Sequence, residues 1–293
     1  MRRSDMNAPS TVDAAWRSHR PYLVNLAYQM LGDVGEAEDV AQEAFLRLAR
    51  APIDEIDDVR GWLTVVAGRL CLDQLRSARM RHERPQDLES VGAVPSTDPE
   101  PADRVTLDDD VRHAMLEVLR RLSPGERVSF VLHDVFGLPF DEIADMVGRP
   151  AGTCRQLARR ARAKFRGDAP YAADITDAEH QLVTETFITA CANGDFEALM
   201  SMLDPTVWGV GTILGAAGLP PQTNYGPDEV GRNLLRYLGG ATLVSAPVGE
   251  PVLLAFDRRR LFAVITLTVR DNLILKIQAT VDPTSRASGT MGR

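Results

Sequence analysis

A run of basic residues near the middle of the chain could bind nucleic acid. Residues 149–166 contain seven basic residues and no acidic one. Arginine and glutamine side chains can read base edges in the major groove of DNA, and further arginines can hold phosphates. A solvated basic helix face is the alternative, and the elements around the run decide between the two.

Apolar residues recur at helical spacing along this run, so it is predicted to be a helix with one buried side. The inward positions are Cys154, Leu157, Ala158, Ala161 and Phe165. The positions left outward are Arg155, Gln156, Arg159, Arg160 and Arg162. This division of apolar and basic sides is the one that a DNA recognition helix needs.

The elements before the basic helix complete a helix-turn-helix pattern. Ser123-Pro124-Gly125-Glu126 predicts a helix start with a capping box, and Gly137 predicts its end. A short helix over 140–147 is then expected to end at Gly148, directly before the basic helix. Two helices joined by a tight glycine-containing turn favour DNA binding over a merely solvated face.

A second candidate surface lies on a helix predicted over 61–79. It combines Trp62 with Arg69, Arg76 and Arg79. An aromatic ring beside arginines suits unpaired DNA, where bases stack and phosphates are neutralised. Two alternatives stay open, because Asp73 is spaced to form ion pairs within this helix and Trp62 could belong to the core.

A third candidate is an acidic helix face. Asp33-x-x-Glu36 predicts a helix start, and the apolar residues between Ala37 and Leu48 keep helical spacing. Glu36, Asp39 and Glu43 share another face of the same helix. Taken alone, this is a solvated face.

The charge distribution separates the middle of the chain from the rest. The net charge is −8. Residues 1–110 hold 13 basic and 21 acidic residues, which gives −8, whereas residues 111–167 hold 11 basic and 6 acidic, which gives +5. Residues 168–293 hold 9 basic and 14 acidic, which gives −5. The positive charge is therefore concentrated in the segment with the helix-turn-helix pattern.

Composition also excludes several classes. No apolar run approaches the roughly 20 residues of a membrane span, and the N-terminus lacks a signal peptide, so we expect a cytoplasmic protein with no membrane partner. Three cysteines and five histidines show no metal or disulfide spacing, so no metal and no cofactor are expected. Residues 85–107 are acidic and rich in proline, which is typical of a linker.

The last segment, residues 175–285, places helices first and strands last, which favours an α+β fold. Strands are expected over 252–256, 261–269 and 273–281, after a glycine- and proline-rich stretch over 209–226. His180 is the only histidine after residue 167, and Asp257 and Asp271 fall at predicted turns. An acid–base pair is not evident, so the chain is not expected to be an enzyme.

Residues 12–166 closely resemble the extracytoplasmic-function (ECF) RNA polymerase sigma factors. The stretches Gly32–Leu48 and Gly61–Arg76 resemble their region 2. The stretches Leu122–Glu126, Phe140–Gly148 and Gly152–Arg162 resemble their region 4. The resemblance implies two all-α sigma domains, region 2 over 10–84 and region 4 over 108–167, on either side of the linker.

The resemblance also implies roles for the three candidate surfaces. Asp39, Gln42 and Glu43 would bind the beta-prime clamp helices of core RNA polymerase. Arg69, Asp73, Arg76 and Arg79, with Trp62, would bind the minus-ten element of promoter DNA. Thr153, Arg155, Gln156 and Arg159 would read the minus-thirty-five element, and we add Arg149 and Arg160 from the same basic run.

The last segment resembles the SnoaL-like domain, a cone-shaped α+β fold with an internal pocket. The resemblance rests on Ala190–Phe196, Leu199 and the stretch Gly226–Leu238. It implies a regulatory module over 175–285, acting either through its surface or as a sensor of a small-molecule ligand with Trp208 or Tyr225 near the pocket mouth.

The sequence thus predicts an ECF-type sigma factor that directs promoter-specific transcription initiation and is modulated by its own C-terminal domain. The alternative is a stand-alone helix-turn-helix regulator with a C-terminal ligand-sensing domain. Such a regulator would bind duplex DNA without polymerase, and it would leave the two N-terminal candidate surfaces unexplained.

Overall fold

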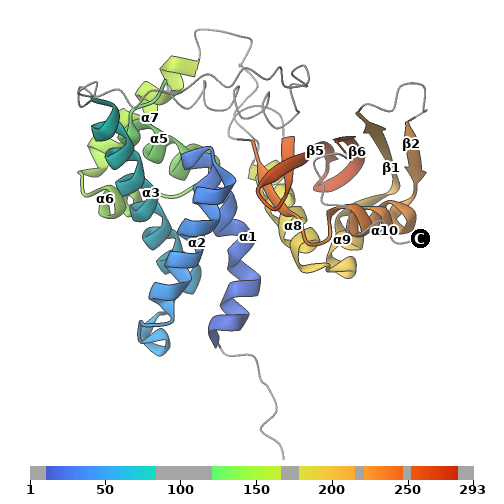
Figure 1. Ribbon diagram of the computed structural model, residues 1–293, viewed down its shortest axis with the longest axis horizontal. Coiled ribbons are helices and arrows are strands. Elements are labelled where there is room, and N and C mark those ends of the chain that lie inside the picture. Colours follow the sequence, from blue (N-terminus) through green and yellow to red (C-terminus); the bar gives the residue numbers. More distant parts are fainter. Residues whose placement is uncertain (1–10, 84–120, 166–177, 215–220, 247–251, 283–293) are drawn as a thin grey trace, which may run out of the picture.

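The computed structural model describes residues 11–83, 121–165, 178–214, 221–246 and 252–282. Figure 1 shows a helical part, coloured blue to green, beside a part in which helices accompany a sheet, coloured yellow to red. The predicted linker over 85–107 lies outside the described residues.

The N-terminal bundle consists of α1 (Thr11–Leu31), α2 (Val34–Leu48) and α3 (Val59–Glu83). Gly32 at φ 78° makes the turn between α1 and α2. The Asp33 carboxylate accepts hydrogen bonds from the backbone N–H groups of Gly35 and Glu36, so it caps α2 as predicted. The helix predicted over 61–79 is present and longer at both ends.

The middle bundle consists of α5 (Pro124–Phe130), a π-helical turn (Val131–Val135), α6 (Phe140–Val147) and α7 (Ala151–Phe165). The predicted capping box is formed, since Ser123 and Glu126 each accept from the other's backbone N–H. Gly137 and Gly148 both have positive φ at the ends of their helices. The predicted helix-turn-helix is therefore confirmed.

The C-terminal domain combines helices with a six-stranded sheet of the order β2-β1-β6-β5-β4-β3. Its described elements are α8 (Ala178–Asn193), α9 (Phe196–Met202), β1 (Leu203–Ile213), β2 (Gln222–Tyr225), α10 (Pro227–Leu238), β3 (Thr242–Ser245), β4 (Val252–Asp257), β5 (Arg260–Arg270) and β6 (Leu273–Val281). The predicted fold class, two all-α parts and an α+β domain, is confirmed.

The sheet is larger than the sequence predicted. The three C-terminal strands are present, but β1, β2 and β3 were not predicted, and most of the described part of 209–226 is strand rather than loop. Pro205, Gly209 and Gly211 lower the strand propensity of β1. Its pairing, parallel to β6 and antiparallel to β2, makes it a strand, and that pairing is a long-range property.

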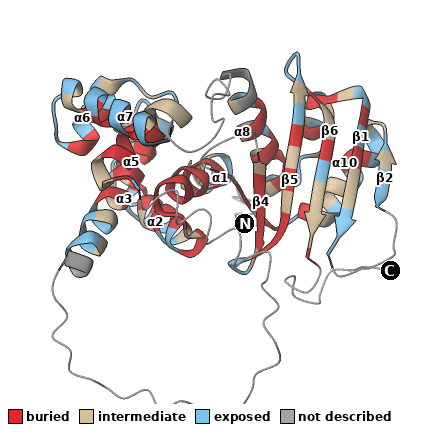
Figure 2. Ribbon diagram, turned by 90° about the horizontal axis from the view of Figure 1, so that it is seen from above, coloured by how far each residue is buried: buried red, intermediate tan, exposed pale blue. Residues whose placement is uncertain are grey.

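The sheet contributes to two hydrophobic cores. Alternate side chains of β3 and β4, such as Leu243 and Leu253, belong to the core shared with the domain's own helices. Their neighbours Val244, Leu254 and Phe256 join the core of the two helical bundles instead. Figure 2 shows buried residues on α1 and β4 where the two parts meet. The C-terminal domain is thus docked on α1 by the β3–β4 half of its sheet.

Within the part of the chain that the structure describes, no helix combines the length and apolar character of a membrane span.

Candidate polymerase and nucleic-acid interfaces

Helix α7, the predicted recognition helix, has the predicted two sides. Cys154, Leu157, Ala158 and Ala161 are buried. Arg149 before the helix and Arg155, Gln156, Arg159 and Arg160 along it are exposed, while Thr153 is half-buried. The side chain of Phe165 lies outside the described residues. The exposed side offers cationic and amide donors with no acidic residue among them, which suits phosphate and base contacts.

Two arginines of α7 are engaged within the middle bundle. The Arg155 guanidinium lies 5.3 Å from the ring centroid of Phe140 on α6, which orients it without removing its donors. Arg162 was predicted to point outward, and it is half-buried and paired within the bundle. Its Nε donates to Asp134 Oδ1 at 2.6 Å, because the nearly buried Asp134 carboxylate needs a cationic partner.

A second ion pair holds α7 against α5. Lys164 Nζ lies 2.7 Å from Glu126 Oε2, and the Glu126 side chain is 7% exposed. Burial alone would raise the pKa of Glu126, but the bonds from Lys164 and the Ser123 backbone bring that pKa below its ordinary value. The Glu126 carboxylate therefore both completes the capping box of α5 and holds α7 against α5.

On α3, the predicted minus-ten residues differ in their surroundings. Arg69, Asp73, Arg76 and Arg79 are exposed, whereas Trp62 is half-buried and packs against the core. Asp73 pairs with Arg76 at 3.9 Å, so part of the predicted ion-pair run exists. Arg69 instead donates to the backbone carbonyl of Asp145 on α6 at 3.0 Å.

That last contact belongs to a wider interface between the two helical bundles. Gly68 lies so close to α6 that a Cβ there would be 3.0 Å from Met146 Sδ. Arg127 of α5 donates to the Met30 carbonyl at the end of α1 at 2.9 Å, and it is buried. The rings of Tyr22 and Phe136 meet edge-on at 5.5 Å. The middle bundle thus rests on α1 and on the central part of α3.

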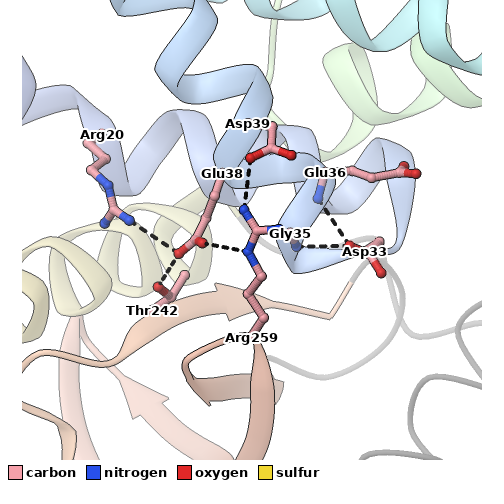
Figure 3. A network of polar contacts seen from close by, with 8 residues as sticks. All are labelled: Arg20, Asp33, Gly35, Glu36, Glu38, Asp39, Thr242 and Arg259. Atoms are coloured by element: carbon pink, nitrogen blue, oxygen red, sulfur yellow. Dashed lines mark hydrogen bonds and ion pairs between the residues drawn. The ribbon is translucent and has the colours of Figure 1, made fainter.

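On α2, the predicted polymerase-binding residues lie on the side away from the core, but one of them is engaged by another domain. Gln42 is exposed, and Glu43 pairs with Arg47 at 2.8 Å. Asp39 Oδ1 accepts from Arg259 Nη2 of the C-terminal domain at 2.8 Å (Figure 3). Sequence reasoning missed Arg259, which lies 220 residues away, and no local pattern could have found it.

Neighbouring Glu38 was also missed, and it binds three groups. Its carboxylate accepts from Arg20 at 3.2 Å and from the Thr242 hydroxyl at 2.8 Å, and Arg259 Nε lies 3.5 Å from it. Figure 3 shows the three partners converging on it from α1 and from the C-terminal domain. The signal available in the sequence was only an acidic residue beside Asp39.

Helix α8 contacts both bundles. Glu185 Oε2 pairs with Arg60 Nη2 of α3 at 2.8 Å. Gln181 donates to the backbone carbonyls of Asp134 and Val135 at the π-helical turn of the middle bundle. The C-terminal domain therefore bridges the two helical bundles.

The predicted sensor residues, Trp208 and Tyr225, lie outside these interfaces. Trp208 and Tyr225 are cross-strand partners on β1 and β2, both exposed, with Lys276 Nζ 4.6 Å from the Trp208 ring centroid. The next residue, Gly209, faces Val230 of α10, so Trp208 faces away from that helix. The side chain of His180 lies outside the described residues. Binding of a small-molecule ligand by this domain stays a prediction.

Two family models match the helical bundles. Sigma-70 region 2 matches residues 15–81, and Sigma-70, region 4 matches residues 112–165. With the fold and the basic side of α7, these matches define the class as a sigma-70-type transcription initiation factor, which is not an enzyme.

Relatives specify the group. The probable ECF RNA polymerase sigma factor SigI of Mycobacterium tuberculosis is 49% identical over 287 residues, covering 96% of each chain. The ECF RNA polymerase sigma factor SigJ of Mycobacterium tuberculosis is 36% identical over 284 residues, covering 90% of this chain and 89% of that relative. The present chain therefore belongs to the ECF RNA polymerase sigma factors, a family that acts with core RNA polymerase on promoter DNA.

A solved structure of a relative is also similar. The crystal structure of the Mycobacterium tuberculosis extracytoplasmic function sigma factor SigJ matches with 28% identity and a TM-score of 0.36, covering 93% of this chain and 97% of that one.

Proposed function

We propose that this sigma factor binds the beta-prime clamp helices of core polymerase through α2, the minus-ten element through α3 and the minus-thirty-five element through α7. The observation that carries the proposal is the exposed side of α7. Arg155, Gln156, Arg159 and Arg160 project from one side of a helix whose other side is buried. That helix follows a glycine turn, as in helix-turn-helix readers of the major groove.

The polymerase-binding part of the proposal rests on α2. Asp39, Gln42 and Glu43 lie opposite the buried stripe that includes Ala37, Ala41 and Ala44, so a partner could reach all three at once. Two carboxylates and an amide offer acceptors to a basic partner surface. Residues 10–84 and 108–167 would form the two sigma domains, joined by the linker, and 175–285 the regulatory domain.

The observed arrangement is a closed form. The minus-ten and minus-thirty-five elements lie roughly 25 base pairs apart, about 85 Å at about 3.4 Å per base pair. The middle bundle instead touches α3 through Met146 and the Asp145 carbonyl. Binding both elements requires the bundles to separate, and Arg69 would then exchange the Asp145 carbonyl for DNA. The 37 residues 84–120 can span at most roughly 120 Å.

Run-off transcription tests the proposal. Core polymerase is supplied with the full-length protein and with the DNA upstream of its own gene. The variant Arg155→Ala with Arg159→Ala removes two recognition contacts, each worth about 1–3 kcal/mol, so transcript should fall about 100-fold. Arg232→Ala, an exposed arginine of α10, is the matched control and should transcribe like the wild type.

The salt dependence of promoter binding separates the two kinds of DNA contact. With about four phosphate contacts, the log–log slope is about −4, and losing two would bring it to about −2. An unchanged slope with relaxed sequence preference would assign both arginines to bases. Tight binding to duplex DNA without core polymerase, and no transcript with it, would overturn the proposal in favour of a stand-alone regulator.

A further inference from the structure

The turn between β4 and β5 carries an arginine onto the start of α2. Arg258 and Arg259 form this two-residue turn with φ of 48° and 68°. Arg259 lies over the first turn of α2, where Gly35 leaves room for it. A Cβ at position 35 would be 2.9 Å from Arg259 Nη1 and 3.2 Å from its Cδ. The arginine is therefore fitted to the helix surface.

The guanidinium binds two neighbouring carboxylates of α2. Its Nη2 donates to Asp39 Oδ1 at 2.8 Å, and its Nε lies 3.5 Å from Glu38 Oε2. Glu38 is 19% exposed and is held by Arg20 and Thr242 as well, whereas Asp39 is 59% exposed. Figure 3 shows Arg259 reaching between the two acids. Glu38 therefore holds Arg259 in place, whereas the more exposed Asp39 carboxylate is accessible to a side chain of another protein.

The contact is held in place by the interface behind it. Asn25 Oδ1 of α1 accepts from both the backbone N–H and the hydroxyl of Ser245 on β3, at 2.8 and 3.1 Å. Gln29 donates to the same residue's hydroxyl at 2.6 Å and to its carbonyl at 3.0 Å. Because these bonds tie the sheet edge to α1, they also set where the β4–β5 turn meets α2.

We propose that Arg259 is an intramolecular competitor of core polymerase, occupying Asp39 in the free protein and leaving it when polymerase binds. The inference rests on the proposed function, in which Asp39 belongs to the polymerase-binding face. A basic side chain of the polymerase and the Arg259 guanidinium would need the same carboxylate oxygen. The C-terminal domain thereby lowers the affinity of this sigma factor for polymerase through one side chain.

The expected effect is modest, because Arg259 and Asp39 are both about half exposed and water screens their attraction. Full-length Arg259→Ala should bind core polymerase about threefold more tightly than the wild type. Arg259→Glu should bind about tenfold more tightly, since its carboxylate repels Glu38 and Asp39. Arg258→Ala is the matched control, because Arg258 lies exposed on the same turn, and should bind like the wild type.

The experiment measures the Kd of full-length proteins for fluorescently labelled core polymerase, with thermal unfolding recorded for each variant. Asp39→Ala is combined with Arg259→Ala in a double-mutant cycle. If Arg259 acts through Asp39, Arg259→Ala should have no effect on the Kd once Asp39 is already alanine. A gain that persists in the Asp39→Ala background would overturn competition at this carboxylate.

The two hypotheses fail differently. Weaker polymerase binding by Asp39→Ala, with unchanged binding by Arg259→Ala, would overturn the competition and leave the proposed polymerase-binding face intact. Unchanged binding on adding Asp39→Ala to Arg259→Ala, where no competitor is left, would remove Asp39 from that face and overturn the proposed function there, and the competition with it. Equal gains in Arg258→Ala and Arg259→Ala would also overturn the competition, since they would reflect net charge alone.

Discussion

Two of the three surfaces proposed for transcription initiation, on α7 and on α2, differ in what occupies them. On α7, the side chains of Arg155, Gln156, Arg159 and Arg160 are exposed, and the two engaged arginines, Arg155 and Arg162, contact their own bundle. On α2, Asp39 is bound by an arginine of the C-terminal domain. The proposed DNA-reading surface is thus formed by a single bundle, whereas the proposed polymerase-binding surface is shared with another domain. Control by the C-terminal domain is therefore expected at the step of polymerase binding.

Within α7, one arginine supports the fold while others are proposed to read DNA, and stability measurements can separate them. Arg162→Ala leaves the nearly buried Asp134 carboxylate without its cation, so the free energy of unfolding should fall by about 2 kcal/mol. Arg160→Ala, at an exposed position of the same helix, should change it by less than about 0.5 kcal/mol. Urea unfolding measures both, and equal losses would contradict the distinction.

The docking of the C-terminal domain can be weakened without touching α2. Asn25→Ala removes the acceptor of two hydrogen bonds from Ser245 and leaves a backbone N–H without it, at a cost of about 1–2 kcal/mol. We expect a lower Tm in thermal unfolding and tighter binding to core polymerase, because the β4–β5 turn loses its support. Unchanged polymerase binding despite the lower Tm would show that the turn does not depend on this docking.

A smaller effect is expected from adding a side chain at Gly35, over which Arg259 lies. In Gly35→Ala, the added methyl group would come within 2.9 Å of Arg259 Nη1, so the arginine must shift. Alanine also favours the helix by about 1 kcal/mol relative to glycine. Core polymerase should bind about twofold more tightly, without loss of helix content by circular dichroism. Weaker binding with a lower Tm would mean that the residue serves the fold alone.

The smallest effect concerns the ion pair between Glu126 and Lys164, which holds α7 against α5, and the pH dependence of its contribution to stability. The pKa of Glu126 lies below its ordinary value of 4.5 in the folded protein, so its interactions stabilise the fold fully above that value. This contribution is lost as the pH falls through the lowered pKa. The difference in Tm between the wild type and Glu126→Gln should be constant near neutral pH and shrink on acidification. A difference that grows on acidification would contradict the direction of the shift.

The features that depend on neighbouring residues could be predicted from the amino-acid sequence. The Ser123–Glu126 capping box, the helix ends at Gly137 and Gly148, and the two sides of α7 are set by local hydrogen bonds and by the 3.6-residue period. The last three strands and their tight turns also follow local patterns. These features sufficed for the fold class and for the family resemblance.

Contacts between residues far apart in the sequence, by contrast, could be identified only in the tertiary structure. Strand β1 exists because β6 and β2 pair with it, Arg162 is paired because the nearly buried Asp134 lies beside it, and Arg69 reaches the Asp145 carbonyl because α6 lies on α3. Arg259 and Asp39 are 220 residues apart. Such contacts depend on how separately formed elements pack, and periodicity within a short window carries no information about that packing.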